Sequence, residues 1–334
     1  MVDAACLMRH RGRRWCTWWV CVAAMAWAAA PVAAQSWPAK PVRVIIPWAT
    51  GGSTDALGRI LAARLSETLG QPFVVENRAG AAGTIGTAMA AKAPPDGYTM
   101  LMGTNSTFVL APFLYKDLGY DNDRSLAPVM LIARSPQAIT VHPSLPVKSL
   151  RELIEFVRKR PGQVNFSSAG SGATSHMATE MLRNAAKLDM THIPYKGGGP
   201  SFQALLSGET ALSFVDVITV LEQARAGRVR VLAISSLQRS PLLPEVPTAS
   251  EAGLPGFDTH TSFAAFMPAG TPREVVTRLN AALVKVMAEP ATRERLVQLG
   301  LEIAATTPEE LVAYQKRESE KWGRVVRENR ITID

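Results

Sequence analysis

The sequence predicts an α/β protein with two lobes, and three observations lead to this expectation. Short β-branched strand patterns alternate with helical patterns along the chain, which is typical of helices packed on mostly parallel sheets. The 300 residues after position 34 are enough for about two lobes. These residues include no cysteine, so a packed core rather than disulfides must stabilise the fold.

Residues 1–34 have the features of a secretory signal peptide. Several arginines between positions 9 and 14 precede an apolar run at residues 15–32, which ends in the small residues Ala33 and Ala34. A membrane anchor is the alternative, because the run is near the lower length limit of a spanning helix. We expect export and cleavage near Ala34, which would remove all three cysteines.

The remaining chain is mildly basic. Of the 36 Lys and Arg and 28 Asp and Glu residues, four Arg and one Asp lie before position 35, which leaves a net charge of +5. The basic residues are scattered, and no basic stripe is interleaved with aromatic residues. Nucleic-acid binding is therefore not expected.

In the first part of the chain, strands are expected at residues 42–46, 73–75 and 98–102. A helix is expected over residues 54–69, since apolar residues recur there at helical spacing and Gly70 follows as a C-terminal cap.

The alternation continues in the second part, where helices are expected from residue 149 to about 159 and from about 174 to 186. Strands are expected at residues 138–141, 164–166, 191–193, 211–215 and 229–234. Capping boxes are predicted at Ser149–Glu152, Thr271–Glu274 and Thr307–Glu310. Residues 238–256 are rich in Pro and Ser and either link the lobes or wrap a surface.

Two glycine-rich turns between a strand and a helix are the candidate functional segments, at residues 47–55 and 166–176. Glycine lets the backbone approach a ligand closely, and a helix N-terminus attracts anions. Each turn alone could equally be a structural turn. Because α/β sheets bind ligands at the carboxyl ends of their strands, two such turns facing each other predict a clamp for one or two carboxylates.

No motif for catalysis or a cofactor is present. The glycine spacings do not fit a dinucleotide or P-loop motif, the hydrolase serine motif fails around Ser168, and the histidines lack metal-ligand spacing. His176 is more typical of a structural or rim residue than of a base. Asp216 either caps a helix or reaches the cleft. We predict no catalytic residue, no metal site and no cofactor.

With these residues in view, the chain resembles the Bug-type substrate-binding receptors of tripartite tricarboxylate transporters. The resemblance runs from Trp37 to the C-terminus. Its motifs include Trp37-Pro-Ala-Lys-Pro, residues 47–55, Val75-Glu-Asn-Arg-Ala-Gly80, Pro95-Asp-Gly-Tyr98, residues 167–176, Pro194-Tyr-Lys-Gly197, residues 247–256 and Pro268-Ala-Gly-Thr-Pro272.

The resemblance implies a type II periplasmic-binding-protein fold, in which two lobes close on the ligand. We expect a discontinuous first lobe at residues 35–137 and 258–334 and a second lobe at residues 138–257. The candidate ligand-binding residues are Trp48, Thr50, Gly51, Gly52, Ser53, Thr54, Asp55, Thr104, Asn105, Ser106, Ser167, Ser168, Ala169, Gly170, Ser171, Gly172, His176, Tyr195 and Asp216.

The resemblance also implies a monomeric periplasmic receptor that delivers a dicarboxylate, acidic amino acid or aromatic acid to membrane permease subunits. A protein that presents the same ligands to a sensor kinase is an alternative, and an exported hydrolase using Ser168 or Ser171 is a remote one. The chain departs from similar receptors at Trp48, in residues 214–217 and at residues 262–264. We expect these positions to decide which acid binds.

Overall fold

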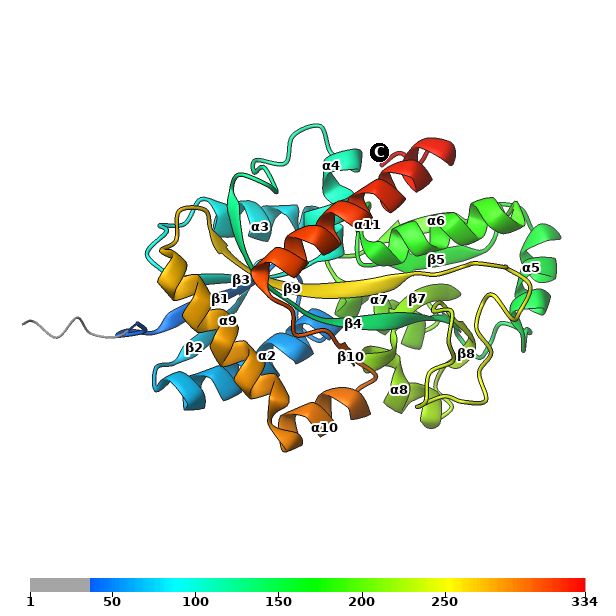
Figure 1. Cartoon of the computed structure of the whole chain (residues 1–334). Coiled ribbons are helices and arrows are strands. Elements are labelled where there is room, and N and C mark those ends of the chain that lie inside the picture. Colours follow the sequence, from blue (N-terminus) through cyan, green and yellow to red (C-terminus); the bar gives the residue numbers. More distant parts are fainter. Residues whose placement is uncertain (1–36, 334) are drawn as a thin grey trace, which may run out of the picture. The chain divides into compact units, whose positions relative to one another are not determined.

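The computed structural model describes residues 37–333, of which those from Lys40 onward form one unit. The predicted signal peptide, its cleavage site and the three cysteines lie outside the described residues. The strands and helices alternate as predicted (Figure 1).

Elements up to the first crossing strand are β1 Val42–Ile46, α2 Ser53–Leu69, β2 Phe73–Asn77, η1 Ala81–Gly83, α3 Thr84–Ala91, β3 Thr99–Thr104, the π-helical segment η2 Ser106–Leu110, α4 Ala111–Leu114 and β4 Leu126–Val141. The following elements are α5 Leu150–Arg158, β5 Asn165–Ser168, α6 Thr174–Ala186, β6 Thr191–Pro194, α7 Gly198–Leu206, β7 Leu212–Asp216, α8 Val217–Arg225 and β8 Arg230–Ile234. The last elements are β9 His260–Pro268, α9 Arg273–Ala288, α10 Pro290–Gln298, β10 Glu302–Ile303 and α11 Pro308–Glu328.

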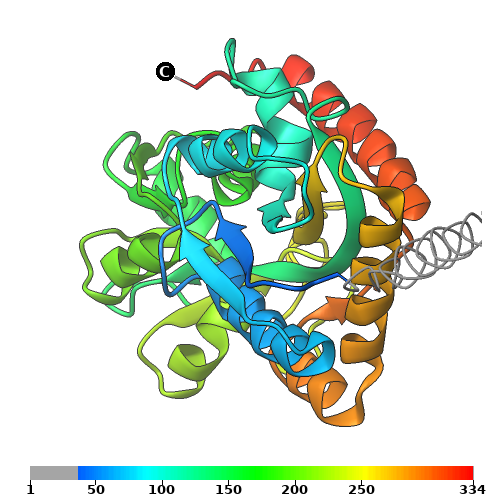
Figure 2. The same ribbon diagram turned by 90° about the vertical axis from the view of Figure 1, so that its left-hand side faces the viewer.

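The strands follow the order β2-β1-β3-β9-β4-β7-β5-β6, with β8 and β10 each paired to β4. The outer strands pair in parallel, β1 with β2 and β3, and β5 with β6 and β7. The central strands β4 and β9 pair antiparallel with each other and with their other neighbours. The 16-residue β4 is much longer than the four-residue strand expected there, and it follows an arc (Figure 2).

The long strand β4 joins two groups of elements, which confirms the two-lobed α/β fold. Its first half pairs with β9, and its second half pairs with β7 and β8. We call the elements around β1, β2, β3 and β9 the first lobe and those around β5 to β8 the second lobe. The lobe limits at 137/138 and 257/258 stay a prediction, since β4 passes the first of them without a break.

Apolar side chains on both faces of the second lobe's strands hold its helices. On one face, Leu153 of α5 and Leu182 of α6 are buried with Phe166 of β5. On the other face, α7 and α8 pack against β7 and β8. In the first lobe, α11 buries Trp322 beside η2 and the sheet, while α2 and α9 pack together on the opposite face (Figure 1).

The predicted helix ends are correct in most cases, as the caps show. Gly70 ends α2 with φ of 70°, and Thr307 begins α11 with a complete capping box. Ser149 accepts a hydrogen bond from the Glu152 amide, but the Glu152 carboxylate accepts one from the amide of Lys148 instead of Ser149.

The capping box expected at Thr271 is wrong. Helix α9 follows Pro272 with no side-chain cap. The Thr271 hydroxyl donates to the carbonyl oxygen of Pro268 at 2.7 Å, so the hydroxyl closes the preceding turn rather than the helix start.

Residues 238–256 wrap the second lobe rather than link the two lobes. Ile234 of β8 pairs with this segment through hydrogen bonds to the Pro247 carbonyl and from the Ala249 amide. Ala249 and Leu254 are buried in the second lobe's core.

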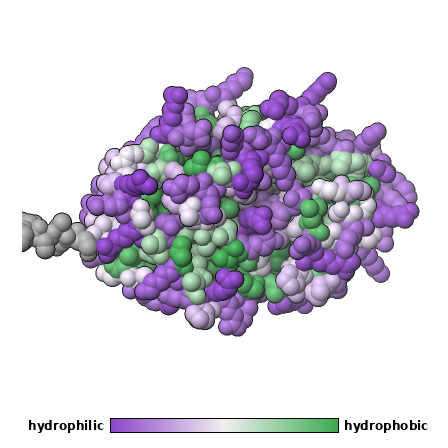
Figure 3. Space-filling model, viewed as in Figure 1, coloured by the Kyte–Doolittle hydropathy of each residue, from purple (hydrophilic) through white to green (hydrophobic). Residues whose placement is uncertain are grey.

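The surface seen in Figure 3 is mainly hydrophilic, with hydrophobic residues in separate groups between polar side chains. Every helix in residues 37–333 is too short or too polar to cross a membrane.

Candidate functional site

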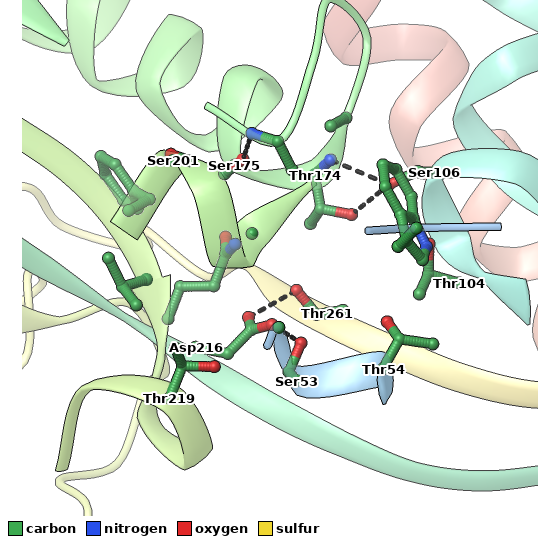
Figure 4. Close-up of a pocket in the computed structure, with 18 of the residues that line it drawn as sticks. Ser53, Thr54, Thr104, Ser106, Thr174, Ser175, Ser201, Asp216, Thr219 and Thr261 are labelled. Atoms are coloured by element: carbon green, nitrogen blue, oxygen red, sulfur yellow. Dashed lines mark hydrogen bonds between the residues drawn. The ribbon is translucent and has the colours of Figure 1, made fainter. Parts of the chain in front are cut away.

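A cavity of about 50 Å³ lies where the carboxyl ends of the parallel strands of both lobes meet. This is the edge at which α/β sheets bind ligands. The cavity is drawn in Figure 4. Its lining consists of Trp48, Gly52, Ser53, Thr54, Thr104, Ser106, Gln137, Ala169, Ala173, Thr174, Ser175, Gly198, Ser201, Ser213, Phe214, Val215, Asp216, Thr219 and Thr261.

Four helices begin at this cavity. Gly52, Ala173, Gly197 and Asp216 are the N-cap positions of α2, α6, α7 and α8, and none of these four residues caps its helix with a side chain. The first turns of all four helices contribute residues to the lining. Because a helix N-terminus presents free N–H groups and a partial positive charge, the cavity favours a negatively charged group.

The side chains around the cavity are mostly hydroxyls. Among the described lining residues, Asp216 alone has a titratable side chain, and none is basic. The attraction for an anion therefore comes from helix starts and neutral donors.

Two polar atoms of the lining have no partner within the described residues. The indole Nε1 of Trp48 and the hydroxyl of Thr104 are both buried and make no hydrogen bond. Leaving such groups unpaired costs about 1–3 kcal/mol each. Both atoms belong to residues that line the cavity.

Asp216 ends β7 in the second lobe and accepts hydrogen bonds from two residues of the first lobe. The hydroxyl of Ser53 donates to one carboxylate oxygen at 2.5 Å, and that of Thr261 donates to the other at 2.6 Å (Figure 4). Burial raises the pKa of Asp216 to about 6, although hydrogen bonds from Ser53, Thr261 and Gln137 favour the charged form.

In the first glycine-rich turn, Trp48, Gly52, Ser53 and Thr54 line the cavity. Thr50 and Gly51 are exposed outside it.

Asp55 also lies outside the cavity lining and holds this first turn in place. Its carboxylate accepts hydrogen bonds from the Gly51 amide, from Arg59 and from Asn77, each within 3.1 Å. Burial alone would raise the pKa of Asp55, but these hydrogen bonds lower it below its usual range. Its carboxylate therefore stays charged at neutral pH and fixes the turn.

In the second turn, Ala169 alone of the predicted residues lines the cavity. Ser167 and Ser168 are completely buried. Gly170 and Gly172 shape the turn with φ of 136° and 84°.

The Ala169 amide donates to the hydroxyl of Ser175 in the lining, and the next residues of the turn contact residues outside the lining. The carbonyl oxygen of Ser171 accepts from Tyr115, and the Gly172 amide donates to His176. The residues that reach the cavity come one step later, at the start of α6: Ala173, Thr174 and Ser175.

Two stacked histidines support the second turn. The rings of His176 and His192 lie 4.0 Å apart, and Phe166 stacks on His192. The Ser168 hydroxyl lies 2.6 Å from His192 Nε2. Burial, followed by the neighbouring His176, lowers the pKa of His192 to about 4, so its ring is neutral at neutral pH.

Three predicted residues at the end of β3 divide between the cavity and its support. Thr104 and Ser106 line it, whereas Asn105 lies behind them. The Asn105 amide oxygen accepts from the Ser262 amide and from the Thr174 hydroxyl, and its nitrogen donates to the carbonyl of His260. Asn105 thereby connects β9 to the start of α6.

Tyr195 lies outside the lining, and its hydroxyl donates to Glu209 at 2.6 Å. Ser262 and Phe263, at one predicted specificity position, are completely buried outside the lining, while the adjacent Thr261 reaches the cavity.

Sequence reasoning missed several lining residues. Gln137 lies on β4 just before the strand expected at residues 138–141, and Thr261 lies on β9 just before the predicted specificity segment 262–264. Ser213 and Thr219 flank Asp216 in the sequence, and the end of a strand followed by a helix was the signal that could have identified them. Ser201 lies in α7, a helix that the sequence analysis did not predict.

Hydrogen bonds between the lobes surround the cavity. The Ala49 amide of the first lobe donates to the Lys196 carbonyl of the second at 3.2 Å. The Ser106 hydroxyl of the first lobe lies 2.9 Å from that of Thr174 in the second. The two lobes are therefore in contact around the cavity.

Comparison with known proteins agrees with this geometry. The sequence model described as "Tripartite tricarboxylate transporter family receptor" matches residues 57–331. The structure of the periplasmic binding protein BugD is similar, with a TM-score of 0.86 and 36% identity over 89% of this chain and 99% of BugD.

Two further similar structures contain organic acids. MatC (Rpa3494) from Rhodopseudomonas palustris, with bound malate, has a TM-score of 0.84 and 34% identity over 87% of this chain and 100% of MatC. Rpa4515 from R. palustris, with adipate, has a TM-score of 0.87 and 35% identity over 89% of this chain and 99% of Rpa4515. The chain therefore belongs to the receptor family of tripartite tricarboxylate transporters and has the fold of the Bug-type periplasmic binding proteins.

Proposed function

We propose that this protein captures a small organic carboxylate in the periplasm and delivers it to the membrane permease of a tripartite tricarboxylate transporter. The main support is the cavity itself, where four helix starts and two unpartnered polar atoms favour an anion without any basic side chain. The acids named in the similar structures, malate and adipate, support the same ligand class.

Closure of the two lobes is the proposed response to ligand. Contacts from both lobes surround the cavity, so an acid held there adds interactions that only the closed arrangement provides. A ligand shifts a conformational equilibrium by its differential affinity for the two states. The closed, loaded receptor would be the form that the permease recognises.

We propose that the protein acts without catalysis. Ser168 forms a close pair with His192, as a hydrolase nucleophile would with its base. However, Ser168 is completely buried and lies outside the cavity lining, and its hydroxyl accepts a hydrogen bond from the Gly170 amide. The pair therefore stabilises the turn.

A thermal-shift panel of organic acids tests the ligand class. At 100 times its Kd, a ligand adds about 2.7 kcal/mol to the free energy of unfolding, which raises Tm by roughly 4 °C for a chain of this size. We expect such a rise with at least one dicarboxylate, acidic amino acid or aromatic acid. No rise with any of these classes would contradict the proposed function.

A pull-down tests delivery. Tagged receptor loaded with the acid that stabilises it most should retain small membrane permease subunits from native membranes. Recovery of a histidine-kinase ectodomain instead would contradict the transport role while leaving acid binding intact.

Replacing Trp48 with Phe tests whether the unpartnered indole N–H contacts the ligand. Hydrogen bonds to charged groups contribute about 1.5–3 kcal/mol, so we expect affinity for the acid to fall about ten-fold or more. Tm without ligand should fall modestly, because the smaller ring leaves a space beside Gly83 and loss of the unpartnered N–H offsets only part of that cost. Unchanged affinity in titration calorimetry would show that the ligand does not contact the indole N–H.

A further inference from the structure

Asp216 is an unusual group for a cavity that attracts anions. Among the described lining residues, Asp216 is the one with a titratable side chain. It takes part in none of the ion pairs between residues that the structure describes. Its partners Ser53 and Thr261 are neutral hydroxyl donors. A buried charge without a counter-charge is unfavourable unless a partner neutralises it.

The position of this carboxylate is fixed. Asp216 lies opposite Gln137 in the pairing of β7 with β4, and it is the N-cap position of α8. Ser53 at the start of α2 and Thr261 on β9 hold its two oxygens from the first lobe. Closing the lobes therefore brings the carboxylate into the cavity instead of letting it turn away.

The cavity has two chemically different sides. In Figure 4, Asp216 lies with Ser53 and Thr261 on one side, while Ser106, Thr174 and Ser175 lie on the other. The second side includes the start of α6, which attracts a carboxylate. A second carboxylate of the same ligand would meet the negative charge of Asp216, whereas a protonated amine there would pair with it.

We propose that the cavity selects a small acid that also has a protonated amine, with the acid group at the start of α6 and the amine at Asp216. This inference rests on the proposed function, because it assigns the second group of a ligand whose first group is the carboxylate. It makes Asp216 the residue that distinguishes acids with a protonated amine from acids without one.

The raised pKa of Asp216 agrees with this assignment. Burial without a cation disfavours the charged carboxylate in the empty closed cavity. A ligand ammonium would remove this cost on binding, and a dicarboxylate would increase it. The same side chain thus favours one class of acid and disfavours the other.

Matched pairs of ligands test the proposal at pH 7.5. Titration calorimetry compares aspartate with succinate and glutamate with glutarate, which differ in one amine. We expect the member with the amine to bind wild-type protein about ten-fold or more tightly than the member without it. The reason is that a close pair of opposite charges strengthens binding relative to the same charge left unpaired. In Asp216→Asn the preference should disappear, with a gain in affinity for the dicarboxylate.

The control variant is Asp189→Asn, which removes the same charge at an exposed position outside the cavity lining. It should retain the wild-type preference. Equal or tighter binding of succinate and glutarate by the wild type would overturn the inference while leaving carboxylate binding established. If malate binds as tightly as aspartate, a neutral hydroxyl suffices and the inference is wrong. Failure of every acid to bind would instead contradict the proposed function itself.

Discussion

Replacing Gly199 with Ala should lower ligand affinity about 100-fold without lowering the stability of the unliganded protein. Gly199 lies in the first turn of α7, and a Cβ atom there would lie 2.4 Å from the carbonyl oxygen of Thr50 and 3.1 Å from the nitrogen of Gly52. These atoms belong to the first lobe and Gly199 to the second, so the collision arises only when the lobes are closed.

The size of the effect follows from this steric conflict. Overpacking typically costs about 1–3 kcal/mol, and contact with backbone atoms leaves little room to relax. Apparent affinity falls in proportion to the population of the binding-competent state. Unfolding of the unliganded protein should not become easier, since the open arrangement avoids the collision and Ala favours a helix over Gly.

Gly103→Ala is the matched control. Gly103 lies on β3 outside the cavity lining, and a Cβ there would come no closer than 3.5 Å to its neighbours, which all belong to the first lobe. It should bind the acid like the wild type. Small-angle scattering with saturating ligand should show a larger radius of gyration for Gly199→Ala than for Gly103→Ala. Binding of Gly199→Ala within three-fold of the wild type would show that the lobes need not approach this closely.

Replacing Asn105 with Ala should lower both the free energy of unfolding and ligand affinity. The amide of Asn105 satisfies the buried Ser262 N–H and the His260 carbonyl, and it also accepts from Thr174. Two backbone groups left without a partner cost about 1–3 kcal/mol each, so we expect a loss on the order of 3 kcal/mol in urea unfolding. Affinity should fall about ten-fold, because Thr174 loses a contact that holds it at the cavity.

Asn280→Ala separates the two effects. The Asn280 amide likewise donates to two backbone carbonyls, those of Val129 and Thr306, but it lies outside the cavity lining. Its removal should also destabilise the fold and leave affinity unchanged. Loss of stability without loss of affinity in Asn105→Ala would mean that the ligand does not depend on the position of Thr174.

Local signals in the sequence predicted much of the fold. The helix from residue 174 to 186 has the expected bounds, because an apolar stripe and its flanking turn are encoded in adjacent residues. β9 was not predicted, and β4 was expected to be much shorter. Their pairing joins residues more than 100 positions apart, such as Arg134 and Ser262, and no local pattern encodes that distance.

The candidate site was predicted in outline but not in detail. The glycine pattern correctly located the two turns, because glycine reports backbone conformation. It did not show which residues face the cavity, so Ser171 and Gly172 were expected where Thr174 and Ser175 lie. Gln137 and Thr261 could not be identified, since isolated polar residues on strands become lining residues only through tertiary pairing.

The four helix starts around the cavity also bear on how receptors of this kind diversify. Their attraction for acids comes from the main chain, and substitutions of side chains leave it in place. Changes at Trp48, Thr104 or Asp216 can therefore alter which acid is preferred without abolishing the capacity to hold an acid.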